Sequence, residues 1–178
     1  MKKLVVYFHG FGSSPNSPKV DRLREEFDTL AVNIDIDPDV AYWKVMGEID
    51  HFLLDYTDED IELIFVGTSL GGWWASCLAE VYDCLAVVIN PSTNPSNTLP
   101  KLDPSIAELA SKYEPITIPR CATYFIAKDD EVIDNSKFID YIVSEVGDSN
   151  KQMYVYDDGG HRFAGEYFER VINYIKSL

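Results

Sequence analysis

Short apolar runs alternate along the chain with longer segments whose apolar residues recur at helical spacing, and this alternation restricts the fold more than any other feature. The runs cover residues 4–8, 30–34, 61–66, 84–89, 122–127 and 152–156. Helical spacing covers residues 19–27, 42–56, 70–81, 138–146 and 163–176. Because the runs are apolar at nearly every position, they are typical of strands buried on both faces. The pattern predicts an α/β fold with a mostly parallel sheet of about six strands and helices on both faces.

The length indicates a single domain. The chain has 178 residues, of which 46% are hydrophobic. Since domains commonly hold about 100–150 residues, a second domain would be very small, and we expect one domain over residues 1–178. The proline-rich stretch 90–119 lies between two predicted strands, and Asp103-Pro104 begins a short helical pattern within it. We expect this stretch to wall a substrate pocket with apolar side chains such as Leu99, Leu102 and Ile106.

The charge of the chain disfavours two classes of partner. The sequence has 30 acidic and 15 basic residues, for a formal net charge of −15. Electrostatic repulsion therefore opposes binding to nucleic acid and to anionic membrane surfaces. No segment approaches the roughly 20 apolar residues of a membrane span. We expect no nucleic-acid partner and no membrane insertion.

The cysteines and the N-terminal segment favour a cytoplasmic location. Cys77, Cys84 and Cys121 are odd in number and lie in apolar stretches, which is typical of buried reduced thiols. The first residues resemble the start of an export signal, but His9 and Gly10 end the apolar run 4–8. An export signal needs an apolar stretch of about 7–15 residues. The sequence therefore predicts a protein of the reducing cytoplasm.

The strongest chemical signal is the G-x-S-x-G pattern formed by residues 67–71, with Ser69 at its centre. It follows a predicted strand and precedes a predicted helix, which is the setting of a nucleophile elbow. In such a turn the glycines let the backbone cross tightly, and the serine hydroxyl projects above the sheet. A glycine-rich turn with a helix-capping serine is the alternative interpretation.

A nucleophilic serine needs a base and an acid that orients the base. Of the three histidines, His51 falls in a predicted helix with polar neighbours, whereas His161 follows Gly159-Gly160 after the last predicted strand. The acid is sought in residues 129–131, Asp-Asp-Glu, which also follow a strand. Asp130 is the expected acid, because the apolar residues Val132 and Ile133 can anchor its turn. The order serine, acid, histidine is that of the α/β hydrolases.

Acyl transfer also needs N–H donors for an oxyanion. The loop His9-Gly10-Phe11-Gly12 leaves the first predicted strand and can present the Phe11 N–H, and the Leu70 N–H can supply a second donor. His9 is expected to brace this loop, with a plain strand-ending histidine as the alternative. Gly10, Gly12 and Trp73 are the expected substrate contacts.

Several motifs together resemble a known family. They are YFHGFGSSP at residues 7–15, VGTSLGG at 66–72 with AE at 79–80, NP at 90–91, DEV at 130–132 and GGHRF at 159–163. This set is similar to the YqiA/YcfP-like small esterases of the α/β-hydrolase superfamily, over nearly the whole chain. The resemblance implies a compact six-stranded α/β-hydrolase fold without a large cap domain. It also implies Ser69 as nucleophile, Asp130 as acid and His161 as base.

No metal or cofactor is expected. Residues 35–39 begin like a calcium loop, but Val40 stands where that loop needs Gly and Met46 where it needs a bidentate Glu. No zinc spacing of Cys and His is present. The glycine loop after the first predicted strand lacks the Lys of a phosphate-binding P-loop.

The sequence therefore predicts a serine hydrolase that cleaves a small carboxylic ester or thioester through an acyl-enzyme. Two alternatives remain: an amide or carbon–carbon bond hydrolase on the same fold, and a non-catalytic binding protein that shares the fold. The pattern indicates neither the acyl group nor the oligomeric state.

Overall fold

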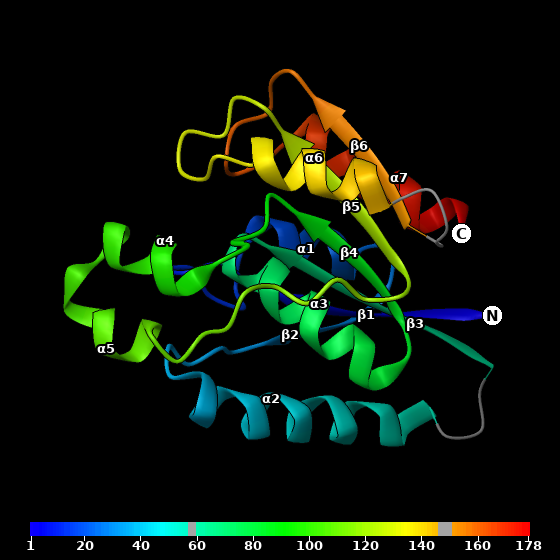
Figure 1. The fold of residues 1–178 in the computed structure, drawn as a ribbon. Helices are drawn as coiled ribbons and strands as arrows, with labels where there is room; N and C mark the ends of the chain where they lie inside the picture. The colour runs from blue at the N-terminus through cyan, green and yellow to red at the C-terminus, as the bar shows by residue number, and fades with distance from the viewer. Residues whose placement is uncertain (57–59, 146–150) are drawn as a thin grey trace.

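A parallel six-stranded sheet forms the centre of the computed structural model, which describes residues 1–56, 60–145 and 151–178 (Figure 1). The strands are β1 (Lys2–Phe8), β2 (Asp28–Val32), β3 (Ile61–Thr68), β4 (Leu85–Ile89), β5 (Ala122–Ala127) and β6 (Lys151–Tyr156). Their order is β2-β1-β3-β4-β5-β6, and each neighbouring pair is parallel. The predicted α/β fold with a sheet of about six parallel strands is confirmed.

Helices cover both faces of the sheet. They are α1 (Pro18–Arg24), α2 (Pro38–Leu53), α3 (Leu70–Tyr82), α4 (Pro95–Leu102), α5 (Ala107–Ala110), α6 (Ser136–Glu145) and α7 (Glu166–Ser177), with 3-10 turns η1 (Leu54–Tyr56) and η2 (Pro104–Ile106). Successive strand residues point to opposite faces. Val6 and Phe8 of β1 therefore join a core with α2, α3 and α6, whereas Val5 and Tyr7 join a core with α1 and α7. In Figure 1, α1 and α7 lie behind the sheet and α3 and α6 in front of it.

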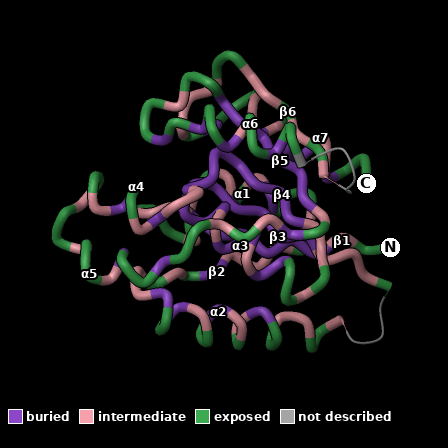
Figure 2. Tube along the Cα trace, in the orientation of Figure 1, coloured by how far each residue is buried: buried purple, intermediate pink, exposed green. Residues whose placement is uncertain are grey.

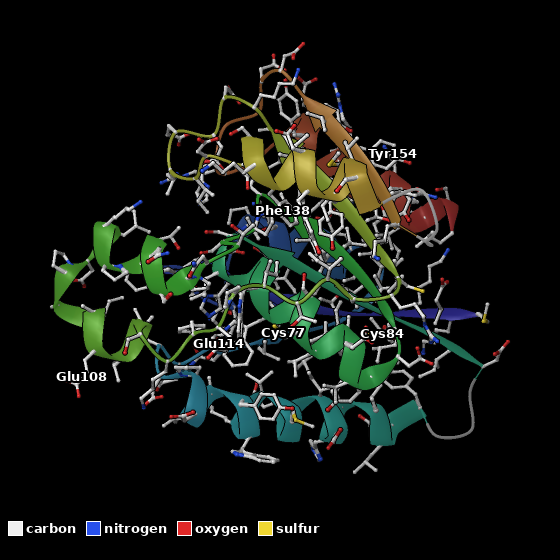
Figure 3. The ribbon with its side chains drawn as sticks, in the orientation of Figure 1. Cys77, Cys84, Glu108, Glu114, Phe138 and Tyr154 are labelled. Carbon is white, nitrogen blue, oxygen red and sulfur yellow. The ribbon has the colours of Figure 1, made fainter. Side chains whose placement is uncertain are left out.

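Burial follows these layers. Figure 2 shows the buried residues concentrated in the strands, while α4 and α5 are mostly exposed or half-buried. Phe138, labelled in Figure 3, reaches from α6 toward the sheet and meets Tyr124 of β5 edge to face, with ring centroids 5.3 Å apart. Among the described residues, no helix has both the length and the apolar character needed to cross a membrane.

Several predicted boundaries move in the structure, and the helices expected over 19–27 and 42–56 are α1 at Pro18–Arg24 and α2 at Pro38–Leu53. The strand expected over 30–34 is β2 at Asp28–Val32, because its ladder with β1 runs from the pair Leu4 and Asp28 to the pair Phe8 and Val32. The helix expected from residue 163 begins at Glu166, because Phe163 and Gly165 have positive φ angles of 46° and 59°, which a helix cannot contain. The end of the helix expected over 138–146 lies outside the described residues.

One helix was not predicted. The stretch 90–119 was expected to hold a short helical pattern after Asp103, and η2 and α5 lie there. The structure adds α4 before it, at Pro95–Leu102, with Pro100 inside the helix. Proline in a helix interior removes a hydrogen bond and disfavours the helix, so propensity argued against α4. Pro95 at its first turn and the burial of Leu99 at 1% exposure favour it instead.

The strand order reverses between β1 and β3, in the interior of the sheet. From β1 the chain moves outward to β2, then returns to the other side of β1 with β3. Ligands of open α/β sheets bind at the carboxyl ends of strands where the order reverses in this way. The loops after β1 and β3 meet there. In Figure 1 both chain termini lie on the right of the sheet, and α4 and α5 project to the left, beyond the carboxyl ends of the strands.

Candidate active site

Ser69 occupies the turn between β3 and α3 in a backbone conformation that serine rarely adopts. Its φ is 58° and its ψ is −120°. Such a residue costs about 1–3 kcal/mol and persists only where its surroundings hold it. The two glycines of the motif make the turn possible: a Cβ on Gly67 would lie 2.0 Å from the Gly71 carbonyl oxygen, and one on Gly71 would lie 1.9 Å from the Phe8 carbonyl oxygen. The motif is therefore a strand-to-helix elbow whose glycines are required by contact.

Hydrogen bonds from the next strand hold this elbow. The Ser69 N–H donates to the Ile89 carbonyl oxygen at 3.0 Å, and the Ser69 carbonyl oxygen accepts from the N–H groups of Ser92 at 3.0 Å and Gly72 at 2.9 Å. The Ser69 residue is 8% exposed. The strained serine is thus fixed by β4 and by its own helix, with its side chain at the carboxyl edge of the sheet.

The loop after β1, residues 9–14, packs directly against the elbow, and we call it the glycine loop. A Cβ on Gly10 would lie 3.3 Å from the Ser69 Cβ and 3.8 Å from its Oγ. Within the described residues, neither the Phe11 N–H nor the Leu70 N–H donates a hydrogen bond. Leu70 opens α3, where N–H groups have no partner within the helix. Both N–H groups are thus unused, one on the loop packed against Ser69 and the other on the residue after it.

His9 braces the glycine loop. The residue is 6% exposed, and its Nδ1 lies 2.9 Å from the Gly10 carbonyl oxygen. The Ile34 N–H donates to its Nε2 at 3.3 Å. Because Nε2 accepts, the ring proton is assigned to Nδ1, which donates to Gly10. Gly12 sits farther out, exposed and with a φ of 71°.

His161 and Asp130 form a buried pair. The His161 Nδ1 lies 3.0 Å from Oδ1 and 2.9 Å from Oδ2 of Asp130. The Asp130 side chain is 1% exposed and that of His161 is 17% exposed. Asp130 Oδ1 also accepts from the N–H groups of Val132 at 2.9 Å and Ile133 at 2.8 Å, so the turn itself anchors the carboxylate. The acceptor at Nδ1 assigns the ring proton there and leaves Nε2 as the basic nitrogen.

The other two carboxylates of this turn hold the backbone of the histidine. We call residues 128–135 the acidic loop and residues 157–165 the histidine loop. Asp129 Oδ1 accepts from the Gly160 N–H at 2.8 Å, and Glu131 Oε2 accepts from the His161 N–H at 2.9 Å. The His161 N–H is the main reason that the pKa of the Glu131 carboxyl is lowered. Three consecutive carboxylates thus bind three different donors of residues 160–161.

Asn90 connects the histidine loop to β5, a role that the sequence reasoning did not assign. It follows β4, is fully buried and has a φ of 41°. Its Nδ2 donates to the carbonyl oxygens of Gly160 at 2.9 Å and His161 at 3.2 Å, and its Oδ1 accepts from the Ala127 N–H at 2.8 Å. The sequence signals for Asn90 were its place directly after a buried strand and its membership in the NP motif at residues 90–91, neither of which indicated these bonds.

Lys19 of α1 holds the histidine loop from the other side. Its Nζ donates to the Arg162 carbonyl oxygen and lies 5.4 Å from the centroid of the Phe168 ring. Burial, and secondarily the charge of Arg162, lowers the pKa of Lys19 to about 8. The histidine loop is therefore held by side chains of α1, by Asn90 and by the acidic loop.

Of the three residues expected to form a triad, Ser69, Asp130 and His161, only two are joined by a hydrogen bond among the described residues. His161 and Asp130 are joined directly. Among the described residues, no hydrogen bond joins the Ser69 Oγ to His161. Catalytic hydrogen bonds are often long without substrate and tighten in the reacting complex.

A cavity of about 170 Å³ lies beside Ser69, and we call it the serine cleft. Its lining comes from the elbow, the segment after β4, α4 and the acidic loop: Ser69, Ser92, Thr93, Thr98, Leu99, Lys101, Leu102, Val132, Ile133 and Asp134. Leu99 and Leu102, expected from the sequence to line a pocket, do so. Ile106 does not line the serine cleft.

Trp73 lies elsewhere. Its indole Nε1 donates to the Glu114 carbonyl oxygen at 2.8 Å, on the connection between α5 and β5 that runs past α3 (Figure 3). Its ring lines a separate groove with aromatic residues of α2 and with Trp74. Trp73 is therefore outside the serine cleft, because residue 73 falls on the side of α3 that faces α2 and α5.

Solved structures of α/β hydrolases match this architecture over almost the whole chain. The Pyrococcus furiosus esterase Pf2001 aligns with a TM-score of 0.75 and 18% identity, covering 99% of this chain and 81% of the esterase. Mouse alpha/beta hydrolase domain-containing protein 10 aligns with a TM-score of 0.72 and 14% identity, covering 98% of this chain and 88% of the mouse protein. The protein has the α/β-hydrolase fold.

The chain belongs to the family described as the uncharacterised protein family UPF0227, whose profile matches residues 4–178. A UPF0227 protein of Vibrio vulnificus is 25% identical over 155 residues, which cover 75% of this chain and 79% of the relative. A UPF0227 protein of Shewanella loihica is 28% identical over 158 residues, which cover 74% of this chain and 78% of the relative. The resemblance to YqiA-like proteins seen in the motifs is confirmed.

Proposed function

We propose that this protein is a serine hydrolase that cleaves a small carboxylic ester or thioester through an acyl-enzyme. The observation that carries the proposal is the His161–Asp130 pair, with a buried carboxylate 2.9 and 3.0 Å from one ring nitrogen, at the sheet edge that also bears the strained Ser69. A histidine oriented in this way has its second nitrogen available as a base. The esterase and hydrolase names of the structural neighbours agree with this class of reaction.

In the first half-reaction His161 Nε2 takes the proton of the Ser69 hydroxyl as Oγ attacks the acyl carbon. The carbonyl oxygen becomes an oxyanion and accepts hydrogen bonds from the Phe11 and Leu70 N–H groups. The C–O or C–S bond then breaks, and the leaving alcohol or thiol takes the proton from His161. Asp130 keeps the imidazole oriented and stabilises its charged form.

In the second half-reaction a water molecule takes the place of the alcohol or thiol that has left. His161 removes a proton from the water, whose oxygen attacks the acyl-serine carbon, and the same oxyanion donors stabilise the intermediate. Collapse breaks the bond to Ser69 Oγ, which regains its proton from His161, and the carboxylic acid leaves. No cofactor enters either step.

The size of the serine cleft favours a substrate with a short acyl group. Its volume of about 170 Å³ is below the roughly 300–1,000 Å³ of pockets that enclose drug-sized ligands. Leu99 and Ile133, which are 1% and 6% exposed, supply buried apolar lining. Gly10, next to Ser69, contacts the carbonyl end of the substrate in this proposal, and Gly12 and Trp73 do not contact the acyl group.

Labelling with a fluorophosphonate tests the mechanism, because this probe reacts with activated serines. The wild-type protein should be labelled at Ser69, identified by mass spectrometry of the peptide, and Ser69→Ala should lose both labelling and ester hydrolysis. Ser111→Ala is the matched control, since its exposed hydroxyl donates to the Glu108 carbonyl oxygen at 2.7 Å, away from the serine cleft. A protein that is folded but unlabelled, or a Ser69→Ala variant that keeps more than about a tenth of the activity, would contradict the acyl-enzyme mechanism.

A further inference from the structure

The serine cleft has two walls that differ in character. One wall is α4, whose Thr98, Lys101 and Leu102 lie three and four residues apart and therefore on one helix face. The other wall is the segment 132–134 of the acidic loop. Most of this lining is apolar or carries hydroxyl groups. Lys101 is the one cationic side chain among the described residues that line the cleft.

Lys101 has no partner within the described part of the chain. No hydrogen bond or ion pair of its ammonium group is present, and its residue is exposed. Lys112 and Lys128, by contrast, bond to Asp37 and Asp157, each at 2.7 Å. Lys44 also has no ion pair among the described residues, but it lies outside the cleft. In a chain of net charge −15, an unpaired cation beside the candidate nucleophile is a local exception.

Asp134 is the acidic residue that lines the same cleft, and its carboxylate already accepts a hydrogen bond within the protein. Its Oδ1 accepts from the Ser136 N–H at 2.9 Å at the start of α6. Hydrogen bonding by Ser136 is the main cause that lowers the pKa of this carboxyl, so it is ionised at neutral pH. No ion pair joins it to Lys101 among the described residues. The cleft thus has a cation without a partner among the described residues and a carboxylate whose Oδ1 is bonded to the backbone at the start of α6.

We propose that Lys101 selects acyl groups that end in a carboxylate, so that the substrate class is the monoester of a short dicarboxylic acid. This inference rests on the proposed function. The ester carbonyl lies at Ser69, the methylene groups contact Leu99, Leu102 and Ile133, and the distal carboxylate accepts a charge-assisted hydrogen bond from Lys101 Nζ. The net negative charge slows the approach of anions, and a local cation offsets that repulsion only at the cleft.

A carboxylate could also sit on the alcohol side of the ester. The position of Lys101 on α4, in the same cavity as the apolar side chains, favours the acyl side. The two cases are separated by three esters: ethyl butyrate is neutral, monoethyl succinate has the same acyl length with a terminal carboxylate, and the butyrate ester of glycolate carries the carboxylate on its alcohol part. Ethyl half-esters are used because aryl half-esters of such acids decompose by attack of their own carboxylate.

The experiment compares kcat/KM for the three esters, measured by acid release in a pH-stat, for the wild type, Lys101→Met and Lys101→Glu. Lys44→Met is the control, since it removes one exposed lysine from α2 outside the cleft. We expect Lys101→Met to lower the succinate-to-butyrate ratio about three- to tenfold, and Lys101→Glu to lower it further. Hydrolysis of ethyl butyrate should change less than about twofold in either variant, and Lys44→Met should leave the ratio unchanged.

Each other outcome counts against the inference. A ratio that is unchanged in Lys101→Met, or that falls equally in Lys44→Met, would overturn it. An effect confined to the glycolate ester would place the alcohol in the serine cleft and would overturn the assignment to the acyl side. If the wild type hydrolyses ethyl butyrate but shows no preference that depends on Lys101, the proposed function stands and only the inference fails. If no ester is hydrolysed and the fluorophosphonate does not label Ser69, both fail.

Discussion

At the scale of single residues, hydrogen bonds to the histidine loop orient the His161 ring without occupying its second nitrogen. His161 has its ring bound by Asp130 and its backbone bound by Glu131 and Asn90, while its Nε2 has no hydrogen-bond partner among the described residues. These partners come from two segments, the acidic loop and the residue that follows β4. Because several weak bonds converge on two residues, the loop has little freedom to move the imidazole. The proposed mechanism needs that orientation.

Asp130→Asn should lower kcat by about 10²- to 10⁴-fold at neutral pH. The amide can place an NH₂ group toward Nδ1, which disfavours the required tautomer, and it removes the charge that stabilises the imidazolium. The measurement is kcat for a short ethyl ester, with circular dichroism to verify folding. A folded Asp130→Asn protein with kcat within about tenfold of the wild type would remove Asp130 from the mechanism.

Glu131 should act on catalysis only through the backbone of His161. Glu131→Gln retains an oxygen that can accept the His161 N–H and should stay within about threefold of the wild-type kcat. Glu131→Ala removes the acceptor and should lower kcat by about tenfold while leaving KM nearly unchanged. Equal losses in the two variants would show that the charge of Glu131, and not its hydrogen bond, matters. The exposed Glu108→Ala, on α5, serves as the matched control.

At the scale of elements, α4 is the part of the fold that defines the serine cleft. The helix is short and contains Pro100, so its own propensity is low. It is held by Leu99, which joins the core with α2, α3 and α6, and by the hydrogen bond between the Ser92 and Thr98 hydroxyls at 2.5 Å. Two of its leucines therefore differ in role: Leu99 anchors the helix, whereas Leu102 is 50% exposed.

The two leucines of α4 should separate stability from specificity. Leu99→Ala should lower the free energy of unfolding by about 2–5 kcal/mol, because it leaves a cavity in the core. Leu102→Ala should change stability by less than about 1 kcal/mol but alter the relative kcat/KM of ethyl acetate, butyrate and hexanoate. Chemical denaturation and an ester series measure both. The exposed Leu54→Ala, in η1, should change neither. An unaltered ester ranking in Leu102→Ala would show that the acyl chain does not enter the serine cleft.

At the scale of the whole molecule, the net charge of −15 acts on every charged group. The structure contains surface ion pairs, such as Lys2 with Asp28 at 2.9 Å and Lys176 with Glu26 at 2.8 Å. Exposed pairs of this kind contribute about 0–1 kcal/mol each. Repulsion among the excess carboxylates opposes them and extends over about 10 Å at 0.1 M salt.

Raising sodium chloride from about 0.02 M to about 0.2 M should therefore stabilise the protein, because screening weakens the repulsion more than it weakens the ion pairs. The expected rise in Tm is about 2–4 °C, which corresponds to roughly 1 kcal/mol for a chain of this size. Differential scanning calorimetry at pH 7 measures it. Sucrose at equal osmolality controls for solvent exclusion. A fall in Tm with salt would show that the ion pairs outweigh the repulsion.

Local patterns in the sequence determined much of this protein. The period of the apolar residues predicted the strands and the helices on both faces, since each element buries its own regular set of side chains. The G-x-S-x-G motif predicted the strained turn at Ser69, because only glycine fits at residues 67 and 71. The position of residues 130 and 161 after strands was enough to expect Asp130 beside His161, since parallel strands end at the same edge of a sheet.

Only the tertiary structure decided the features that depend on contacts between distant segments. The bonds of Asn90 to the histidine loop, the use of Asp129 and Glu131 as acceptors for residues 160–161, and the gathering of α4 beside Ser69 join residues about 30 to 70 positions apart. The sequence placed Trp73 near the nucleophile because it lies close in the chain, but one turn of α3 directs it to another groove. Helical propensity argued against α4, and burial of Leu99 outweighed it, because packing energy depends on neighbours that no local pattern contains.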